Sequence, residues 1–265
     1  IYHMGVLGGI ERGGDEEDDP ISWTERINTG GPEWKAPGKG ETLEGNPDGK
    51  KPVVGGNTFV VVAADGEDEV HADGLCAAEA CRLITAHKDE PFWLGVGFVR
   101  PHVPFVSPPQ YHEPYPFEAV GHEPRIQELA KPGINYKTSL NMQMDLEKQK
   151  KALAGYYAAV AFMDAQVGKV LDALSAAGLD DRTIVVFTSD HGYHLGEHDF
   201  WAKVSLHEES AAVPLLIAVP GKKPAVCNSL VEMLDLYPTT AALCGLETQP
   251  RLQGRNIAAL FDDPS

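Results

Sequence analysis

The sequence predicts an α/β protein in which strands and helices alternate along the chain. Short, continuously apolar runs of strand length occur at Phe59–Val62, Phe92–Phe98 and Thr183–Thr188. Between them lie segments whose apolar residues recur at helical spacing. Strands that are apolar on both faces are typical of a mostly parallel sheet covered by helices on both sides. We therefore expect one α/β domain over residues 1–265, incomplete at both ends.

The N-terminal part of the chain predicts little regular structure. Residues 1–58 are rich in glycine, proline and acidic residues and show no apolar period, so we expect a mostly irregular surface excursion. The α/β core should extend over residues 59–265. It begins with the strand at Phe59–Val62, followed by a helix over Asp73–His87. That helix contains Cys76 and Cys81, which we expect to pack as small apolar residues.

The second half of the chain has clearer periodicity. A proline-rich loop extends to about Pro132, and a long helix is predicted over Asp145–Ala177 with Gly178 as its C-terminal cap. After the strand at Thr183–Thr188, another strand is predicted over Pro214–Val219. A last helix should span Leu230–Leu243.

The composition excludes several classes of protein. The net charge of −17 argues against a nucleic-acid partner, because phosphate binding needs clustered lysine and arginine. No apolar run is long enough to span a bilayer, and no signal peptide is visible. The four cysteines have neither zinc-site spacing nor a disulfide-dense pattern.

Residues suited to catalysis follow two of the predicted strands. Asp190 and His191 come after the strand that ends at Thr188, and His102 follows the apolar run that ends at Phe98. Ligands of α/β sheets bind beyond the carboxyl ends of the strands, so we expect these side chains to lie at one edge. A carboxylate beside an imidazole suits a divalent metal.

Each of these residues also has a plainer interpretation. The Asp190–His191 pair could be a hydrogen-bonded loop, His102 between two prolines could be a structural turn residue, and Lys203 could be an ordinary surface lysine. Against this, four of the ten histidines crowd into residues 191–207. A solvated loop does not need so many.

Taken together, these segments resemble the sulfatase family, and especially its iduronate-2-sulfatase-like branch. The strongest similarity is in Thr183–Lys203, TIVVFTSDHGYHLGEHDFWAK, followed by VPLLIAVPG. A second block is GFVRPHVPF at Gly97–Phe105, and a third is YYAAVAFMDAQVG at Tyr156–Gly168. The first residues, Ile1-Tyr2-His3, are similar to the end of another family motif.

The resemblance implies an alkaline-phosphatase-like fold and the hydrolysis of sulfate esters, with sulfated sugars as the favoured substrates. It implies a formylglycine nucleophile and a Ca²⁺ ion, with Asp190 and His191 as metal ligands. His102 would be the general acid, Lys203 would bind a sulfate oxygen, and His3 would assist sulfate release. His194 is a further candidate substrate contact.

The sequence also departs from the family pattern. No cysteine or serine opens the Cys/Ser-x-Pro-x-Arg motif from which formylglycine is made. We therefore expect a fragment whose nucleophile lies in a missing N-terminal segment and which is inactive alone. By family, the protein would be exported (periplasmic, extracellular or lysosomal).

Two alternatives remain open. A phosphodiesterase or phosphonate hydrolase of the same superfamily would share the fold and the Asp-His-Gly region. A non-catalytic binder of sulfated glycans would keep the anion site without the chemistry. The nucleophile would distinguish them, because threonine indicates phosphoryl transfer.

Overall fold

The computed structural model of the chain describes residues 13, 21–33, 35–43, 59–121, 144–203 and 205–263. The chain divides into two compact units, and one domain over residues 1–265 stays a prediction. Unit 1 comprises residues 1–179 and 189–213, and unit 2 comprises residues 180–188 and 214–265. His102, Asp190, His191 and Lys203 all belong to unit 1.

Unit 1 contains a three-stranded sheet in the order β1–β2–β3. The strand predicted at Phe59–Val62 is confirmed as β2 (Val60–Ala64), which pairs antiparallel with β1 (Gly38–Thr42) and parallel with β3 (Phe105–Ser107). β1 lies within the segment predicted to be mostly irregular. Its sequence, GKGET, has no apolar alternation, and most of its residues are exposed. Such a polar edge strand gives no periodic signal.

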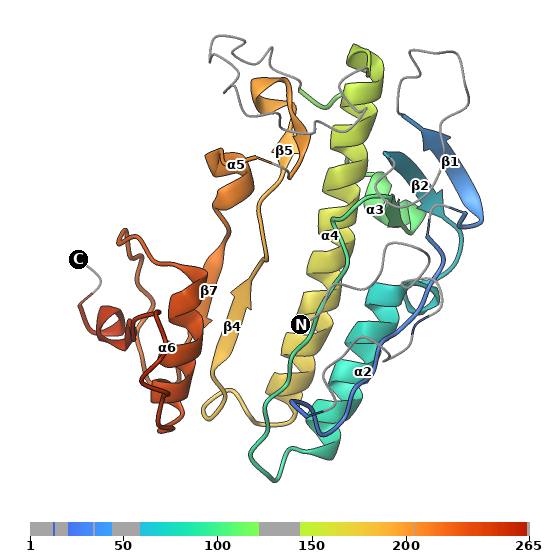
Figure 1. Cartoon of the computed structure of the whole chain (residues 1–265). Coiled ribbons are helices and arrows are strands. Elements are labelled where there is room, and N and C mark those ends of the chain that lie inside the picture. The colour runs from blue at the N-terminus through green and yellow to red at the C-terminus, as the bar shows by residue number, and fades with distance from the viewer. Residues whose placement is uncertain are drawn as a thin grey trace. The chain divides into compact units, whose positions relative to one another are not determined.

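Two long helices of unit 1 match their predictions closely. α2 (Ala72–Ala86) packs along α4 (Leu146–Ala176), as Figure 1 shows. α4 begins after Asp145, whose side chain accepts a hydrogen bond from the Lys148 N–H at 2.9 Å. Beyond its end, Gly178 has φ +68°, the left-handed conformation expected of a C-terminal cap. No helix in the described parts of the chain is long and apolar enough to cross a bilayer.

The remaining elements of unit 1 are short. They are η1 (Asp68–Val70), α3 (Pro109–His112), the antiparallel pair β5 (His194–Leu195) and β6 (Trp201–Ala202), η3 (Glu197–Asp199) and α5 (Glu208–Ala211).

One aromatic cluster joins distant parts of unit 1. The Phe59 ring lies edge-on to the rings of Phe105 and Trp201, with centroids 5.7 and 5.9 Å away. All three side chains are buried, as is Val103 in the same core. Residues from β3 and from β6 therefore share one hydrophobic core.

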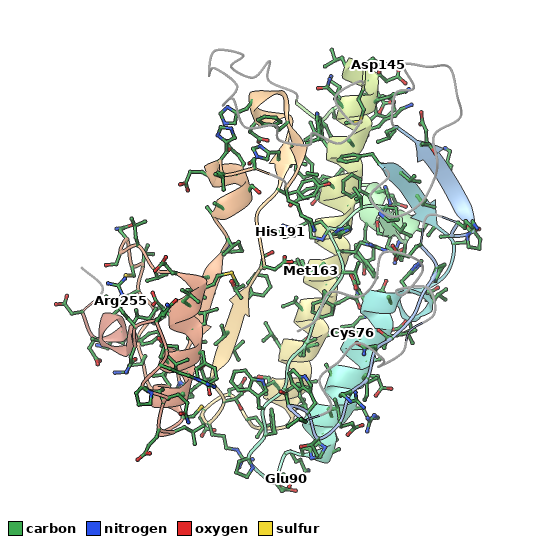
Figure 2. All side chains as sticks on the ribbon, viewed as in Figure 1. Cys76, Glu90, Asp145, Met163, His191 and Arg255 are labelled. Atoms are coloured by element: carbon green, nitrogen blue, oxygen red, sulfur yellow. The ribbon has the colours of Figure 1, made fainter. Side chains whose placement is uncertain are left out.

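The cysteines behave as expected. Cys76 and Cys81 lie on α2 (Figure 2 labels Cys76), where both are partly buried and free. Burial raises the pKa of the Cys76 thiol to about 11, which disfavours the reactive thiolate. Cys227 and Cys244 are also free, and both are exposed.

Unit 2 contains β4 (Val185–Thr188) and β7 (Leu215–Ala218), which confirm two predicted strands. The predicted helix at Leu230–Leu243 is shorter than expected. It consists of η4 (Met233–Asp235) followed by α6 (Leu236–Leu243), and η5 (Ala258–Phe261) comes later. The Asp235 side chain accepts hydrogen bonds from the Glu232 and Arg255 N–H groups. These bonds favour a capped turn where the sequence pattern suggests continuous helix.

Strand pairing differs from the predicted mostly parallel sheet. Among the described strands only β2–β3 is parallel, whereas β1–β2, β4–β7 and β5–β6 are antiparallel. The chain between β4 and β7 contains no long crossover helix of the kind that usually joins parallel neighbours.

The strand predicted at Phe92–Phe98 is wrong, because that run pairs with no other described strand. Its exposure alternates, and Trp93 is 68% exposed. An apolar run signals burial, but it does not specify a pairing partner.

The close approach of α4 to the sheet gives a first prediction. A Cβ at Gly155 would lie 2.6 Å from Val61 Cγ2 and 3.3 Å from Phe105 Cβ, whereas a Cβ at Gly168 would meet nothing within 4 Å. Gly155→Ala should therefore lower the free energy of unfolding by about 1–3 kcal/mol through overpacking. Gly168→Ala, in the same helix, should raise it by about 0.5–1 kcal/mol. Urea unfolding of both variants measures these changes. Equal effects of the two substitutions on the free energy of unfolding would contradict the close packing of α4 against the sheet.

Candidate functional site

The first turn of α2 anchors the loop that carries His102. The Asp73 carboxylate, in the first turn of α2, accepts hydrogen bonds from the N–H of Val99 at 2.8 Å and of Arg100 at 2.9 Å. Asp73 is only 3% exposed. Hydrogen bonds from backbone amides to a buried carboxylate are strong, so they fix where this loop begins.

A buried ion pair also anchors this loop. The Arg100 guanidinium pairs with Glu33, and both side chains are almost completely buried. Arg100 Nε also donates to the Val106 carbonyl at 2.9 Å, and Nη1 donates to the His102 carbonyl at 3.2 Å. Arg100 therefore ties the His102 backbone to β3 and to Glu33.

His102 itself is partly buried and oriented by one ring nitrogen. Its Nδ1 lies 2.6 Å from the Val103 carbonyl, so Nδ1 carries a proton and Nε2 is the nitrogen available for chemistry. The pKa of His102 is lowered, chiefly by burial and further by the nearby positive charges of Lys203, Arg100 and His191, while the bond to the Val103 carbonyl acts in the opposite direction.

Asp190 and His191 lie together in the segment after β4 (Figure 2 labels His191). His191 Nε2 is 3.4 Å from Asp190 Oδ2, and its Nδ1 is 2.8 Å from the Gly192 carbonyl. The Gly192 N–H donates to the Ser210 carbonyl, and a Cβ there would lie 2.2 Å from the Glu209 carbonyl oxygen. Only glycine fits this turn.

Lys203 follows the second strand of the β5–β6 pair. Its neighbour Ala202 has φ +70°, an unfavourable conformation for a residue with a Cβ, and Trp201 is buried in the core. The Lys203 carbonyl accepts hydrogen bonds from the Ser210 hydroxyl and the Ser205 N–H. The pKa of Lys203 is lowered because partial burial disfavours the charged ammonium, and the Asp190 carboxylate opposes that effect.

These electrostatic interactions link the two loops. Lys203 interacts with Asp190, and His102 interacts with both Lys203 and His191. The four side chains that the sequence singled out therefore share one neighbourhood within unit 1. It combines a cation, an imidazole with one available nitrogen and an exposed carboxylate.

The Asp190–His191 pair can supply two ligands to one divalent cation. The Asp190 carboxylate is 76% exposed and the His191 side chain 29% exposed, so both are accessible. A carboxylate suits a hard ion, while imidazole suits several divalent metals. Ca²⁺ takes about 6–8 ligands, so such an ion would need further donors besides this pair.

The remaining predicted site residues are His194 and His3. His194 is 1% exposed, and its Nε2 lies 2.6 Å from the Ser205 hydroxyl. This burial gives it no access to a substrate in the described conformation, and its predicted substrate contact stays untested. His3 lies outside the described residues.

Sequence reasoning missed the residues that position the site. Glu33, Asp73 and the Arg100 side chain touch none of the reacting groups, but they hold the His102 loop. In the sequence, Asp73 is only an acidic residue at the start of a predicted helix, and Arg100 is only an arginine two residues before a candidate histidine. Neither observation indicates a partner far away in the sequence.

Comparison with known proteins identifies the family. Residues 30–246 match the sequence profile of the Sulfatase family, which is most of the chain. The chain belongs to the sulfatase family. Iduronate 2-sulfatase of Mus musculus is 32% identical over 236 residues, which cover 72% of this chain and 43% of the mouse protein. The chain thus spans less than half the length of this relative.

Solved structures agree on the fold of this chain. YidJ of Bacteroides fragilis, a candidate sulfatase, matches with a TM-score of 0.62 and 26% identity, over 80% of this chain and 44% of that one. A phosphonate monoester hydrolase from Silicibacter pomeroyi matches with a TM-score of 0.66 over 76% of this chain and 43% of that one. At 22% identity the latter shows the fold alone. The predicted alkaline-phosphatase-like α/β fold is confirmed, and the chain covers part of it.

The anchoring of the His102 loop gives a second prediction. Asp73→Ala leaves the N–H groups of Val99 and Arg100 without their carboxylate partner, which should cost about 1–3 kcal/mol for each buried group. Asp73→Asn keeps one acceptor oxygen and should have an intermediate effect. Hydrogen exchange of these two amides is the measurement. If both stay fully protected in Asp73→Ala, the anchor lies elsewhere.

Proposed function

We propose that this chain contributes the metal-binding and sulfate-binding side chains of a calcium-dependent formylglycine sulfatase. The observation that carries the proposal is the shared neighbourhood of Lys203, His102 and the Asp190–His191 pair. Membership of the sulfatase family supports it. The formylglycine would be contributed by a segment that these 265 residues do not contain.

Lys203 suits the binding of a sulfate group. Its ammonium is a compact charge with three donors, and partial burial strengthens its attraction for an anion relative to an exposed lysine. The hydrogen bonds to its carbonyl, together with the buried Trp201, fix the backbone from which the side chain extends. A Ca²⁺ ion held in part by Asp190 and His191 would offset further negative charge on the sulfate.

His102 suits the delivery of a proton to the departing alcohol. With Nδ1 bonded to the Val103 carbonyl, the imidazolium would donate through Nε2, and the loop anchored by Asp73 and Arg100 would keep that nitrogen in place. Because the pKa of His102 is lowered, the protonated form is populated only at more acidic pH than for a free imidazole. Proton donation should therefore weaken as the pH rises through this lowered pKa.

Sulfated sugars are the substrate class we favour. The mouse relative is named for a sugar acid, iduronate, and a sugar alkoxide is a poor leaving group that requires a proton. The same family resemblance favours export of the protein, which cell fractionation would test.

A phosphonate or phosphodiester hydrolase is the second candidate, because a phosphonate monoester hydrolase shares the fold. The two functions differ in the anion that is turned over. Comparison of kcat/KM for matched sulfate and phosphonate monoesters decides between them. A clear preference for the phosphonate would overturn the proposal.

The role of His102 gives a third prediction, for an enzyme that contains this chain together with a Cys/Ser-x-Pro-x-Arg segment. His102→Ala should slow hydrolysis of a sugar sulfate by roughly 10²–10⁴-fold, since the alkoxide must be protonated as it leaves. A nitrophenyl sulfate should be affected much less, because nitrophenolate can leave without a proton. The measurement is kcat/KM for both substrates.

Lys203→Ala is the matched control for that comparison. It removes a contact to the sulfate that both substrates share, so it should slow both to the same extent. If His102→Ala also slows both equally, His102 is a binding or structural residue.

The metal ligands give a fourth prediction. Asp190→Asn should weaken Ca²⁺ binding by at least about 10-fold, because a hard cation loses a charged oxygen ligand. Asp172→Asn, which changes an exposed carboxylate on α4, should leave binding unchanged. Calcium titration by calorimetry measures both, and unaltered binding by Asp190→Asn would remove Asp190 from the site.

A further inference from the structure

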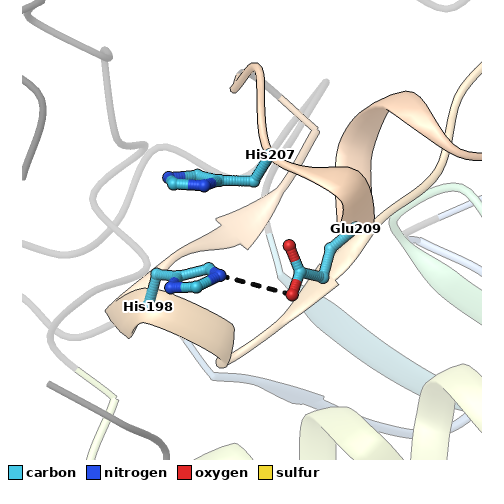
Figure 3. Close-up of side chains that lie close together, drawn as sticks. All are labelled: His198, His207 and Glu209. Atoms are coloured by element: carbon cyan, nitrogen blue, oxygen red, sulfur yellow. Dashed lines mark ion pairs between the residues drawn. The ribbon is translucent and has the colours of Figure 1, made fainter. Parts of the chain in front are cut away.

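A second cluster of metal-ligating side chains lies in unit 1. His198 comes from η3, His207 precedes α5, and Glu209 lies in its first turn. One ligand atom of each residue lies within 4.8 Å of the others, and this is the one group of three or more possible ligands among the residues that the structure describes. Figure 3 shows the two imidazole rings and the carboxylate facing one another.

The spacing of these groups is close to that of ligands on one small ion. His198 Nε2 is 3.3 Å from Glu209 Oε1. Two ligands at about 2.0–2.2 Å from a tetrahedral zinc ion lie roughly 3.3–3.5 Å apart. The rings of His198 and His207 stack at 4.3 Å with 16° between their planes, so at least one ring must tilt out of the stack before a nitrogen of each points at one ion.

A buried third histidine provides an independent observation. His194 is 1% exposed, and its ring lies 6.2 Å from that of His198 and 5.8 Å from that of His207. Its Nε2 is engaged with the Ser205 hydroxyl, whereas its buried Nδ1 has no hydrogen-bond partner within the described structure. A buried ring nitrogen without a partner is costly in either tautomer, and in the tautomer with the proton on Nε2 a metal could complete Nδ1.

Hydrogen bonds and turns hold the backbone that carries the cluster. The N–H groups of Ser210 and Ala211 donate to the His207 carbonyl, and the His207 N–H donates to the Ser205 hydroxyl. On the other side, His198 has φ +56° in a turn that Gly196 opens at φ +106°. A histidine held in the left-handed region is unusual, and such conformations concentrate at functional sites.

We propose that His198, His207 and Glu209 bind a divalent transition metal of the zinc class. Two imidazole nitrogens and one carboxylate oxygen are a donor set that Zn²⁺ prefers, and three protein ligands leave a fourth position for water or for His194. Ca²⁺ would not choose this set, because it takes many oxygen ligands. His198 and Glu209 are 19% and 29% exposed, so an ion can reach them.

Such an ion would stabilise the segment that carries Lys203. η3 precedes Lys203 in the sequence, and His207 and Glu209 follow it. A metal shared between them would fasten both sides of this segment without touching Asp190 or His191. The proposal therefore does not depend on sulfatase activity.

Titration of the metal-free protein with Zn²⁺, and with Co²⁺ as a spectroscopic probe, tests the proposal. We expect one tight Zn²⁺ site per chain, distinct from any weaker binding at the Asp190–His191 pair, and a visible Co²⁺ spectrum typical of four-coordinate nitrogen and oxygen ligation. His207→Ala and Glu209→Gln should each weaken Zn²⁺ binding by about 10–100-fold or more. Zn²⁺ should raise the Tm of the unaltered protein more than that of either variant.

Two control variants make the result specific. His87→Ala disrupts another His–Glu pair, in which His87 Nδ1 lies 2.6 Å from Glu90 Oε1, and should leave Zn²⁺ binding unchanged. Asp190→Asn should also leave it unchanged, whereas loss of Zn²⁺ binding in that variant would place the ion at the Asp190–His191 pair. Absence of Zn²⁺ and Co²⁺ binding by the unaltered protein overturns the proposal even if the variants fail to fold.

Discussion

The buried pair of Glu33 and Arg100 is the interaction on which the candidate site most depends. Two opposite charges have been removed from water, and further hydrogen bonds to the charged groups help to offset that cost. Arg100 achieves this through the carbonyls of Val106 and His102, while Asp73 accepts the backbone N–H groups of Val99 and Arg100. Loss of either charge would leave the other buried without its partner. The backbone position of His102 thus depends on the buried charges of Glu33, Arg100 and Asp73.

A hydrophobic core links this loop to the one that carries Lys203. Val103, next to His102, and Trp201, two residues before Lys203, belong to the same buried cluster around Phe59. Apolar packing is not directional, but a close-packed interior allows little displacement of either loop. The His102 and Lys203 side chains therefore face one region because their neighbours share a core. The interaction of Lys203 with Asp190 brings the metal pair into the same region.

The sequence predicted the parts of the fold that carry a local signal. α2 and α4 followed from helical periodicity and capping residues, and β2, β4 and β7 followed from apolar runs. The polar strand β1 was missed, and Phe92–Phe98 was assigned wrongly, because pairing depends on a partner remote in the sequence. Asp190, His191, His102 and Lys203 were found because they follow predicted strands or lie in a family motif. Glu33 and Asp73 were not, since their importance arises only from long-range contacts.

The central claim is that His102, Lys203 and the Asp190–His191 pair bind one sulfate group together with a cation. A crystal structure of the protein with Ca²⁺ and sulfate tests it most directly. The account predicts a cation at Asp190 and His191, and a sulfate within hydrogen-bond distance of both Lys203 Nζ and His102 Nε2. A sulfate bound elsewhere, or a His102 ring turned away from Lys203 and Asp190, would contradict it.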